Sequence, residues 1–349
     1  MRLTNCLCIA VFAAWILAGN CQDTLAQGVK DLQGTISVDG SSTVAPITIQ
    51  ADASFRDVCP NVKVPVGVSG TGGGFKRFTK GETDISDASR PIKYEEFQKC
   101  KENGVTFYEI PVAYDGLTIA VSKNNDFIDT LTIDDLKKIF LASKKDKSFV
   151  NAKTWNEVNA SWPNKPIKIF APGTDSGTFD YFKEVVAGKT DSIRDDMSPS
   201  EDDNVLVQGI ANTDGAIGFF GASYYFSNRD KLKAIKIVNP ENNEAVALSA
   251  ENIESGKYAP FSRPLFIYVN AKSAKRPEVK TFVQHYMANA VELAAKVKYV
   301  GLPAELNEAA KNHFKKRMTG THYWKMEDGK AMKREGSLKE IYTKENLMK

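Results

Sequence analysis

The chain has 349 residues, 42% of them hydrophobic and 26% charged, which is enough for about two domains with packed cores. Its 46 Lys and Arg residues nearly balance its 43 Asp and Glu residues. The net charge of +3 is scattered along the chain, which argues against a nucleic-acid-binding protein.

The first segment indicates export. A positive residue precedes a short apolar run at 9–17, and small residues follow as far as Ala26. The run is too short to span a bilayer, so we interpret residues 1–26 as a signal peptide that is cleaved after Ala26. A lipid anchor at Cys21 is the less favoured alternative. We therefore expect a periplasmic or otherwise extracytoplasmic protein, with any membrane transport step carried out by another chain.

Only Cys59 and Cys100 follow this segment. In an oxidising compartment a cysteine pair can form a disulfide, and each of these two residues ends a predicted helix just before a strand. One interpretation is therefore a disulfide between neighbouring helix ends, and the alternative is two unlinked thiols. The three histidines occur late and without a ligand spacing, so no metal site is predicted.

Apolar strands alternate with helical stretches after the signal segment. This alternation predicts an α/β domain with a largely parallel sheet. The expected strands are 35–39, 62–68 and 83–87, and the expected helices are 44–55, 72–78 and 94–101.

Two long extended segments, 107–122 and 263–269, interrupt this alternation. We interpret them as crossovers between two lobes, with a turn at Asp115-Gly116 in the first segment. Helices at 133–140 and 178–186 and strands at 167–170 and 215–220 lie between the crossovers. The predicted lobes are 27–114 plus 264–349, and 115–263. The charged stretch after Trp324 is typical of a solvated tail.

Four clusters of small residues follow strands. In the first cluster, Ser42, Thr43 and Val44 directly precede a helix, so hydroxyls and free backbone amides could face an oxyanion. Taken alone, these residues fit ordinary helix capping better than an anion site. The second cluster, 69–76, includes Thr71 and four glycines, which let backbone amides approach an anion closely. It matches neither the Walker pattern nor the dinucleotide pattern.

The third cluster, 85–91, contains Asp87, Ser89 and Arg90. An arginine there can clamp an oxyanion with two parallel N–H donors, although a surface arginine is the alternative.

The fourth cluster, 173–179, lies before a helix. It lacks the glycines of a nucleophile elbow and has no histidine nearby in the sequence, so it gives no support for a serine hydrolase. Ligands of open α/β sheets bind at the carboxyl ends of strands, so all four clusters predict one anion site between the lobes. The candidate ligands in the fourth cluster are Asp175, Ser176, Gly177 and Thr178.

The segments GSSTVAPI, GVSGTGGGF, DISDASRPI and GTDSGTFDYF occur in this order. Together they resemble the anion-binding turns of periplasmic phosphate-binding proteins of ABC importers. The resemblance implies a type II periplasmic-binding fold with two α/β lobes, a two-strand hinge and an interlobe cleft. It also implies a monomeric receptor that uses no cofactor, binds inorganic phosphate and meets the membrane permease subunits.

The chain departs from this family at two positions. Pro172 stands where many members carry an arginine, and Ser89 stands where many carry an aspartate. We expect Arg90 to replace the arginine and either Asp87 or Asp175 to accept the proton of the ligand. Sulfate has no proton to donate, so a buried carboxylate would reject it. The alternatives are a receptor for sulfate, molybdate or tungstate, and a secreted phosphatase.

Overall fold

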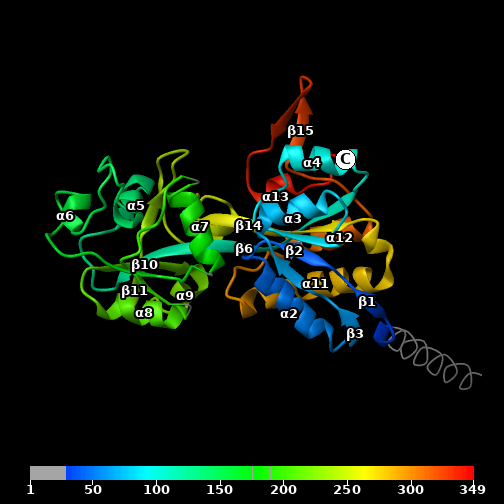
Figure 1. Ribbon diagram of the computed structural model, residues 1–349, viewed down its shortest axis with the longest axis horizontal. Helices are drawn as coiled ribbons and strands as arrows, with labels where there is room; N and C mark the ends of the chain where they lie inside the picture. Colours follow the sequence, from blue (N-terminus) through cyan, green and yellow to red (C-terminus); the bar gives the residue numbers. More distant parts are fainter. Residues whose placement is uncertain (1–28, 175, 189, 201) are drawn as a thin grey trace, which may run out of the picture.

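The computed structural model describes residues 29–174, 176–188, 190–200 and 202–349. The expected signal segment and Cys21 lie outside the described residues. Two α/β lobes lie side by side along the longest axis (Figure 1). Lobe 1 contains α2, α3, α4, α11 and α12, and lobe 2 contains α5 to α9. The predicted two-lobed α/β fold is confirmed.

One sheet connects the lobes, in the order β4-β2-β5-β14-β6-β10-β8-β9, with β11 also paired to β6. In lobe 1, β2, β4 and β5 are parallel, so their carboxyl ends share one edge. The sheet strands are β2 (Val38–Gly40), β4 (Val66–Val68), β5 (Ile85–Ala88), β6 (Phe107–Ser122), β8 (Lys168–Ala171), β9 (Ser198–Pro199), β10 (Ala216–Gly221), β11 (Leu232–Ala234) and β14 (Ser262–Asn270).

Helices cover both faces of this sheet. The longer ones are α2 (Ala45–Phe55), α3 (Gly70–Phe78), α4 (Tyr94–Glu102), α5 (Ile133–Phe140), α7 (Gly177–Val186), α8 (Asp203–Asn212), α11 (Pro277–Lys296) and α12 (Ala304–Lys315). The remaining elements are β1 (Gln33–Thr35), β3 (Asn61–Lys63), β7 (Thr130–Leu131), α6 (Trp155–Val158), α9 (Ala222–Phe226), β12 (Lys236–Val238), β13 (Ala245–Val246), α10 (Ala250–Glu254), η1 (Ser273–Lys275), β15 (Trp324–Glu327), β16 (Lys330–Lys333) and α13 (Leu338–Ile341).

The connection between the lobes is β6. It pairs with β14 as far as Gly116, and from Leu117 onward it pairs with β10. The predicted turn at Asp115-Gly116 is wrong, because both residues are paired with β14 inside a continuous strand. The lobe boundaries expected at 114/115 and 263/264 fall within this paired segment, and they stay predictions.

The two cysteines do not form the predicted disulfide. Both Cys59 and Cys100 are buried free thiols, and Cys59 Sγ donates to the carbonyl of Val29 at 3.2 Å. Cys59 follows α2 and Cys100 lies in α4, and these helices cover opposite faces of the sheet (Figure 1). The expectation of neighbouring helix ends was wrong because the sheet separates them.

The segment after Trp324 is not a solvated tail. Its β15–β16 hairpin projects from lobe 1, and the chain then returns to the lobe at α13 (Figure 1). Leu338, Ile341 and Tyr342 are each 3% exposed, and the Tyr342 hydroxyl donates to the carbonyl of Glu109 at 2.7 Å. A buried apolar face at helical spacing therefore holds the charged end of the chain against the lobe.

Candidate functional site

Helix starts from both lobes meet at the hinge. In lobe 1, α2 begins at Ala45 and α3 at Gly70, each just after a strand. In lobe 2, α7 begins at Gly177 after β8, and the Ser176 side chain caps it by accepting from the Thr178 amide at 3.2 Å. The first amides of a helix have no partner within the helix and carry partial positive charge, so these ends favour an anion.

The lobes touch at Thr43 and Gly177. A Cβ on Gly177 would lie 3.0 Å from both Cα and Oγ1 of Thr43. This approach joins the first and fourth predicted clusters across the cleft. It also explains the glycine, because a side chain at position 177 would hold the two helix starts apart.

Arg263, in hinge strand β14, is the main cation at this contact. Its Nη2 donates to Thr43 Oγ1 at 3.0 Å, and its Nε lies 3.3 Å from Asp115 Oδ2. The guanidinium lies over the ring of Tyr181, 3.6 Å from the centroid, and Nη1 lies 3.6 Å from Glu184. The Arg263 side chain is 13% exposed, so lobe 1, lobe 2 and the hinge all fix its position.

Asp115 provides a buried carboxylate beside this arginine. It is 1% exposed, and its Oδ1 has no hydrogen-bond partner among the described residues. Burial raises the pKa of Asp115, and the charge and hydrogen bond of Arg263 oppose that rise. Asp115 Oδ1 is therefore available to accept a hydrogen bond, and its burial disfavours the charged form of the carboxyl group.

The second and third predicted clusters also meet. The hydroxyls of Thr71 and Ser89 lie 3.1 Å apart, and the Ser89 amide donates to Thr71 Oγ1 at 3.1 Å. In the first cluster, Val44 is the N-cap residue of α2, and Ser42 beside it is half-buried. The structure thus places hydroxyls from α3 and the end of β5 beside each other.

The structure does not leave Arg90 available to clamp an anion. Its Nη1 and Nη2 donate to the two oxygens of Glu96 at 2.9 and 2.8 Å, and Nη1 also donates to the Pro91 carbonyl. The guanidinium lies 5.3 Å from the centroid of Phe75. Because Glu96 already neutralises it, Arg90 fixes the start of α4, and Arg263 is the cation that reaches the cleft.

Asp87 is also not brought to the cleft. Its carboxylate is fully buried and accepts from Thr48 Oγ1 at 2.9 Å, and that hydroxyl is 3.1 Å from the Tyr286 hydroxyl. Burial raises the pKa of Asp87 to about 8, a rise that Thr48 opposes and Asp39 increases. Asp87 thus packs beneath the first turns of α2 and against α11. Asp175 lies outside the described residues.

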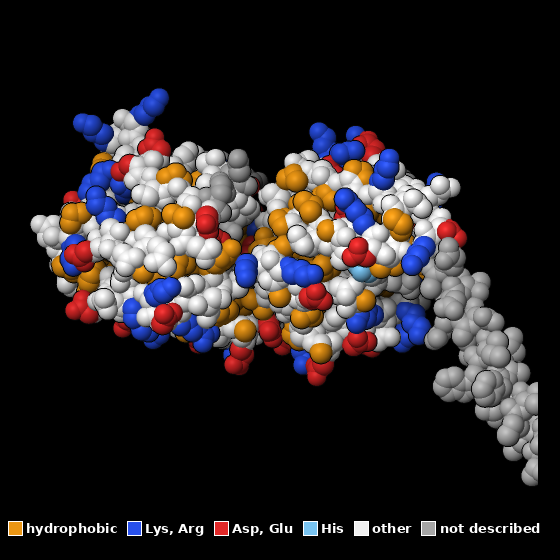
Figure 2. Space-filling view, turned by 90° about the horizontal axis from the view of Figure 1, so that it is seen from below, with side chains coloured by type: hydrophobic (Ala, Val, Ile, Leu, Met, Phe, Trp, Pro, Cys, Tyr) orange, Lys and Arg blue, Asp and Glu red, His pale blue; other side chains and the backbone are white. Residues whose placement is uncertain are grey.

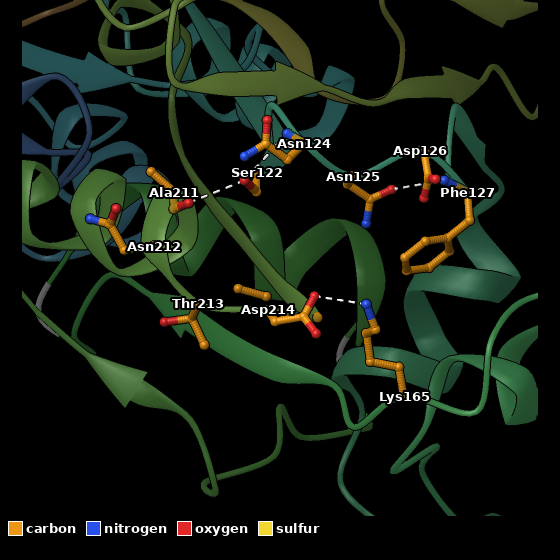
Figure 3. Close-up of a pocket in the computed structure, with 12 residues that line it drawn as sticks. Ser122, Asn124, Asn125, Asp126, Phe127, Lys165, Ala211, Asn212, Thr213 and Asp214 are labelled. Carbon is orange, nitrogen blue, oxygen red and sulfur yellow. Dashed lines mark hydrogen bonds and ion pairs between the residues drawn. The ribbon is translucent and has the colours of Figure 1, made fainter.

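Lobe 2 has a separate polar hollow of about 220 Å³ (Figure 3). Its polar groups largely bind one another, as with Lys165 and Asp214 at 2.8 Å and Ser122 Oγ with the Ala211 carbonyl at 3.1 Å. It shares no residue with the four clusters. The hollow therefore adds nothing to the anion site.

Arg263, Asp115 and Tyr181 are the site residues that the sequence analysis missed. Arg263 opens an apolar extended run, RPLFIYV, and a charged residue there was a signal that could have been used. In the described ranges, no group of three or more His, Cys, Asp or Glu side chains is placed to hold a metal ion. Among the described helices, none combines the length and apolar character needed to cross a membrane.

Comparisons with known proteins agree on one family. The family model described as a PBP superfamily domain matches residues 26–290. Protein SphX of Synechococcus elongatus is 47% identical over 286 residues, covering 82% of this chain and 83% of that protein. Phosphate-binding protein PstS of Staphylococcus haemolyticus is 40% identical, covering 84% and 90%.

Solved structures give the same result. A crystal structure described as a possible phosphate binding protein from Planctomyces limnophilus has 42% identity and a TM-score of 0.78, covering 82% of this chain and 99% of that one. An ABC-type phosphate transport receptor from Vibrio cholerae, with 22% identity and a TM-score of 0.57, shares the fold.

Proposed function

Because the chain belongs to the PBP superfamily, whose relatives here include phosphate-binding proteins, we propose that it is a receptor that binds inorganic phosphate between its lobes. The observation that carries this proposal is the position of Arg263. One guanidinium contacts Thr43 of lobe 1, Asp115 of the hinge and Tyr181 of lobe 2. An anion bound there would be held by both lobes at once.

The ligand oxygens are assigned to donors from all four clusters. The first-turn amides of α2 and α7 and the hydroxyls of Thr43 and Thr178 bind from opposite lobes. Thr71 and Ser89 supply two further hydroxyls, and Arg263 supplies charged donors. These donors sit on helix and strand ends that packing already fixes, so binding orders few side chains.

We assign to Asp115 the role of accepting a hydrogen bond from the O–H of the ligand. Inorganic phosphate still carries an O–H near neutral pH, because its second ionisation leaves one proton that only the third ionisation removes. That O–H can donate to the unpartnered Oδ1 of Asp115, whereas sulfate would place an oxygen lone pair there. An unpaired buried carboxylate costs several kcal/mol, so sulfate is disfavoured. This role replaces the one expected for Asp87.

The family supports a cellular role in phosphate import. We place the mature protein outside the cytoplasm, where it delivers phosphate as a monomer to the permease subunits of an ABC importer. The apolar segment at 9–17 supports export by a signal peptide that ends at Ala26, with a lipid anchor at Cys21 as the alternative.

Calorimetric titration of ligand-stripped protein tests this function. We expect one phosphate per chain, competition by arsenate, and no measurable heat with sulfate, molybdate or tungstate. A protein that binds sulfate but not phosphate would contradict the proposal. Steady hydrolysis of phosphate esters would instead indicate the alternative of a secreted phosphatase.

A further inference from the structure

A second recess lies at the end of lobe 1 that faces away from the cleft. It has a volume of about 870 Å³ and lies between α11, α12 and the start of β6. Its residue Tyr108 is at the beginning of β6, whereas the hinge residues of the cleft lie near Gly116 on the same strand. The recess shares no residue with the four clusters. Any ligand bound there would thus be separate from one held by Arg263.

The floor of this recess is apolar. The Tyr108 and Phe314 rings pack edge to face with centroids 4.8 Å apart, and Met287 lies beside them in the lining. These three side chains are 8%, 7% and 3% exposed, so the lobe's own packing fixes them. Ala274 and Ala288 widen the recess because their side chains are short. Such a floor favours an apolar ligand body.

The rim of the recess is cationic, and its lining residues include no Asp or Glu. The cations are Lys275, Lys280, Lys311, Lys315 and Arg317. In the described part of the chain, Lys311 is paired with Glu308 at 2.8 Å and the other four form no ion pair. The charge on this rim is thus largely uncompensated. We call this apolar floor and cationic rim the basic groove.

Both flanking helices contribute to the rim. Lys280 and Gln284 lie one turn apart on α11, and Lys311 and Lys315 lie one turn apart on α12, so each pair shares a helix face. Burial raises the pKa of the Tyr108 hydroxyl, and the nearby Arg317 guanidinium opposes that rise. Positive charge therefore surrounds the floor from α11, from α12 and from Arg317, which lies two residues after the end of α12.

We propose that the basic groove binds an anionic amphiphile, namely a single-chain fatty carboxylate. Its chain would lie on Tyr108, Met287 and Phe314, and its carboxylate would pair with the lysines of the rim. The volume is within the range of small-molecule sites, roughly 300–1,000 Å³. A three-turn peptide helix, about 10 Å across and about 16 Å long, would not fit inside it.

Calorimetric titration with dodecanoate, below its micelle-forming concentration, tests this site on the full-length mature protein. We expect one dodecanoate per chain. Lys280→Glu combined with Lys315→Glu should weaken it at least about tenfold, a loss of about 1.4 kcal/mol. The matched control combines Lys63→Glu with Lys145→Glu, which makes the same change in net charge at exposed sites outside the groove. The control should bind dodecanoate like the parent protein, and phosphate affinity should stay unchanged in both variants.

Four results would overturn the proposal. The first is that dodecanoate fails to bind, and the second is that neutral dodecyl maltoside monomers bind equally well. Alternatively, both double variants lose affinity equally, which would indicate unspecific charge attraction. Finally, an acidic amphipathic peptide binds the groove and dodecanoate does not, which would assign the groove to a protein partner. Because phosphate is titrated in parallel, failure here is distinguishable from failure of the proposed phosphate site.

Discussion

At the scale of single residues, anion binding in the cleft depends on the contacts that fix the Arg263 side chain. The guanidinium lies flat on Tyr181 and reaches Thr43 and Asp115 with different nitrogens. This planar fork orients donors toward both lobes, which a lysine ammonium cannot do. Tyr181 is itself anchored, because its hydroxyl donates to the Pro260 carbonyl at 2.7 Å.

Arg263→Ala should therefore weaken phosphate binding strongly. Loss of a desolvated charged donor costs about 3 kcal/mol, or about two orders of magnitude in affinity. Arg263→Lys should recover only part of this loss. Arg90→Ala is the matched control, because Glu96 occupies its guanidinium, and its phosphate affinity should stay within about threefold of the parent protein. Calorimetry of the three variants would reject the assignment if Arg90→Ala had the larger effect.

Asp115→Asn should reduce the preference for phosphate over sulfate. Asparagine is nearly isosteric, but its amide can donate to a fully ionised oxyanion, so sulfate binding should become measurable. Asp87→Asn is the comparison, because Asp87 is fully buried against Thr48 and should leave the ratio unchanged. Parallel titrations with phosphate and sulfate measure the ratio of the two affinities in each variant. A changed ratio in Asp87→Asn alone would show that Asp87 accepts the proton of the ligand, as expected from the sequence.

At the scale of elements, β5 buries an acid against α2 and α11. The pKa of Asp87 is raised from 3.8 to about 8 by burial, so the folded state keeps its proton where the unfolded state loses it. The contribution to stability is fully present below pH 3.8 and is lost as pH rises toward about 8.

Asp87→Asn should make the free energy of unfolding less dependent on pH, because the amide stays neutral and still accepts from Thr48. Urea unfolding of phosphate-free protein at several pH values between about 4 and 8 measures this free energy. If the parent protein and the variant show parallel pH profiles, then Asp87 does not carry a proton in the folded state.

Much of this arrangement was predictable from local sequence. Glycine and hydroxyl residues at strand ends marked the four turns, because they are needed wherever a backbone must approach an anion closely. Arg263 was missed because its role arises from the β6–β14 pairing, which places it opposite Asp115. Arg90 was misassigned because its guanidinium is paired with Glu96 in the first turn of α4, a contact that the sequence does not show. The predicted disulfide was wrong because the sequence does not show which face of a sheet each helix covers.

At the scale of the whole molecule, binding requires the two lobes to meet. Viewed from below, the space-filling surface narrows to a waist between them (Figure 2). The hinge strands β6 and β14 cross this waist, and the contact between Thr43 and Gly177 brings the helix starts together. Closing such a cleft around an anion buries it and strengthens every charged contact.

Gly177→Val should hinder this approach, since even a Cβ would lie 3.0 Å from Thr43. Overpacking typically costs about 1–3 kcal/mol, so phosphate affinity should fall between about fivefold and about 150-fold. Stability without phosphate should change little, because the clash arises only between lobes. Gly221→Ala is the control, as its nearest contact would be at an ordinary 3.7 Å. Unchanged affinity in Gly177→Val would show that the ligand does not need this contact.

The central claim is that one tetrahedral anion is held between the lobes beside Arg263. Arsenate resembles phosphate in shape and protonation, and arsenic scatters anomalously. The most direct test is therefore an anomalous difference map from crystals of the arsenate-bound protein. The account predicts one peak per chain, within hydrogen-bonding reach of the Arg263 guanidinium, the Thr43 hydroxyl and the first amides of α7. A principal peak beside Arg90, or elsewhere on the surface with the cleft empty, would contradict it.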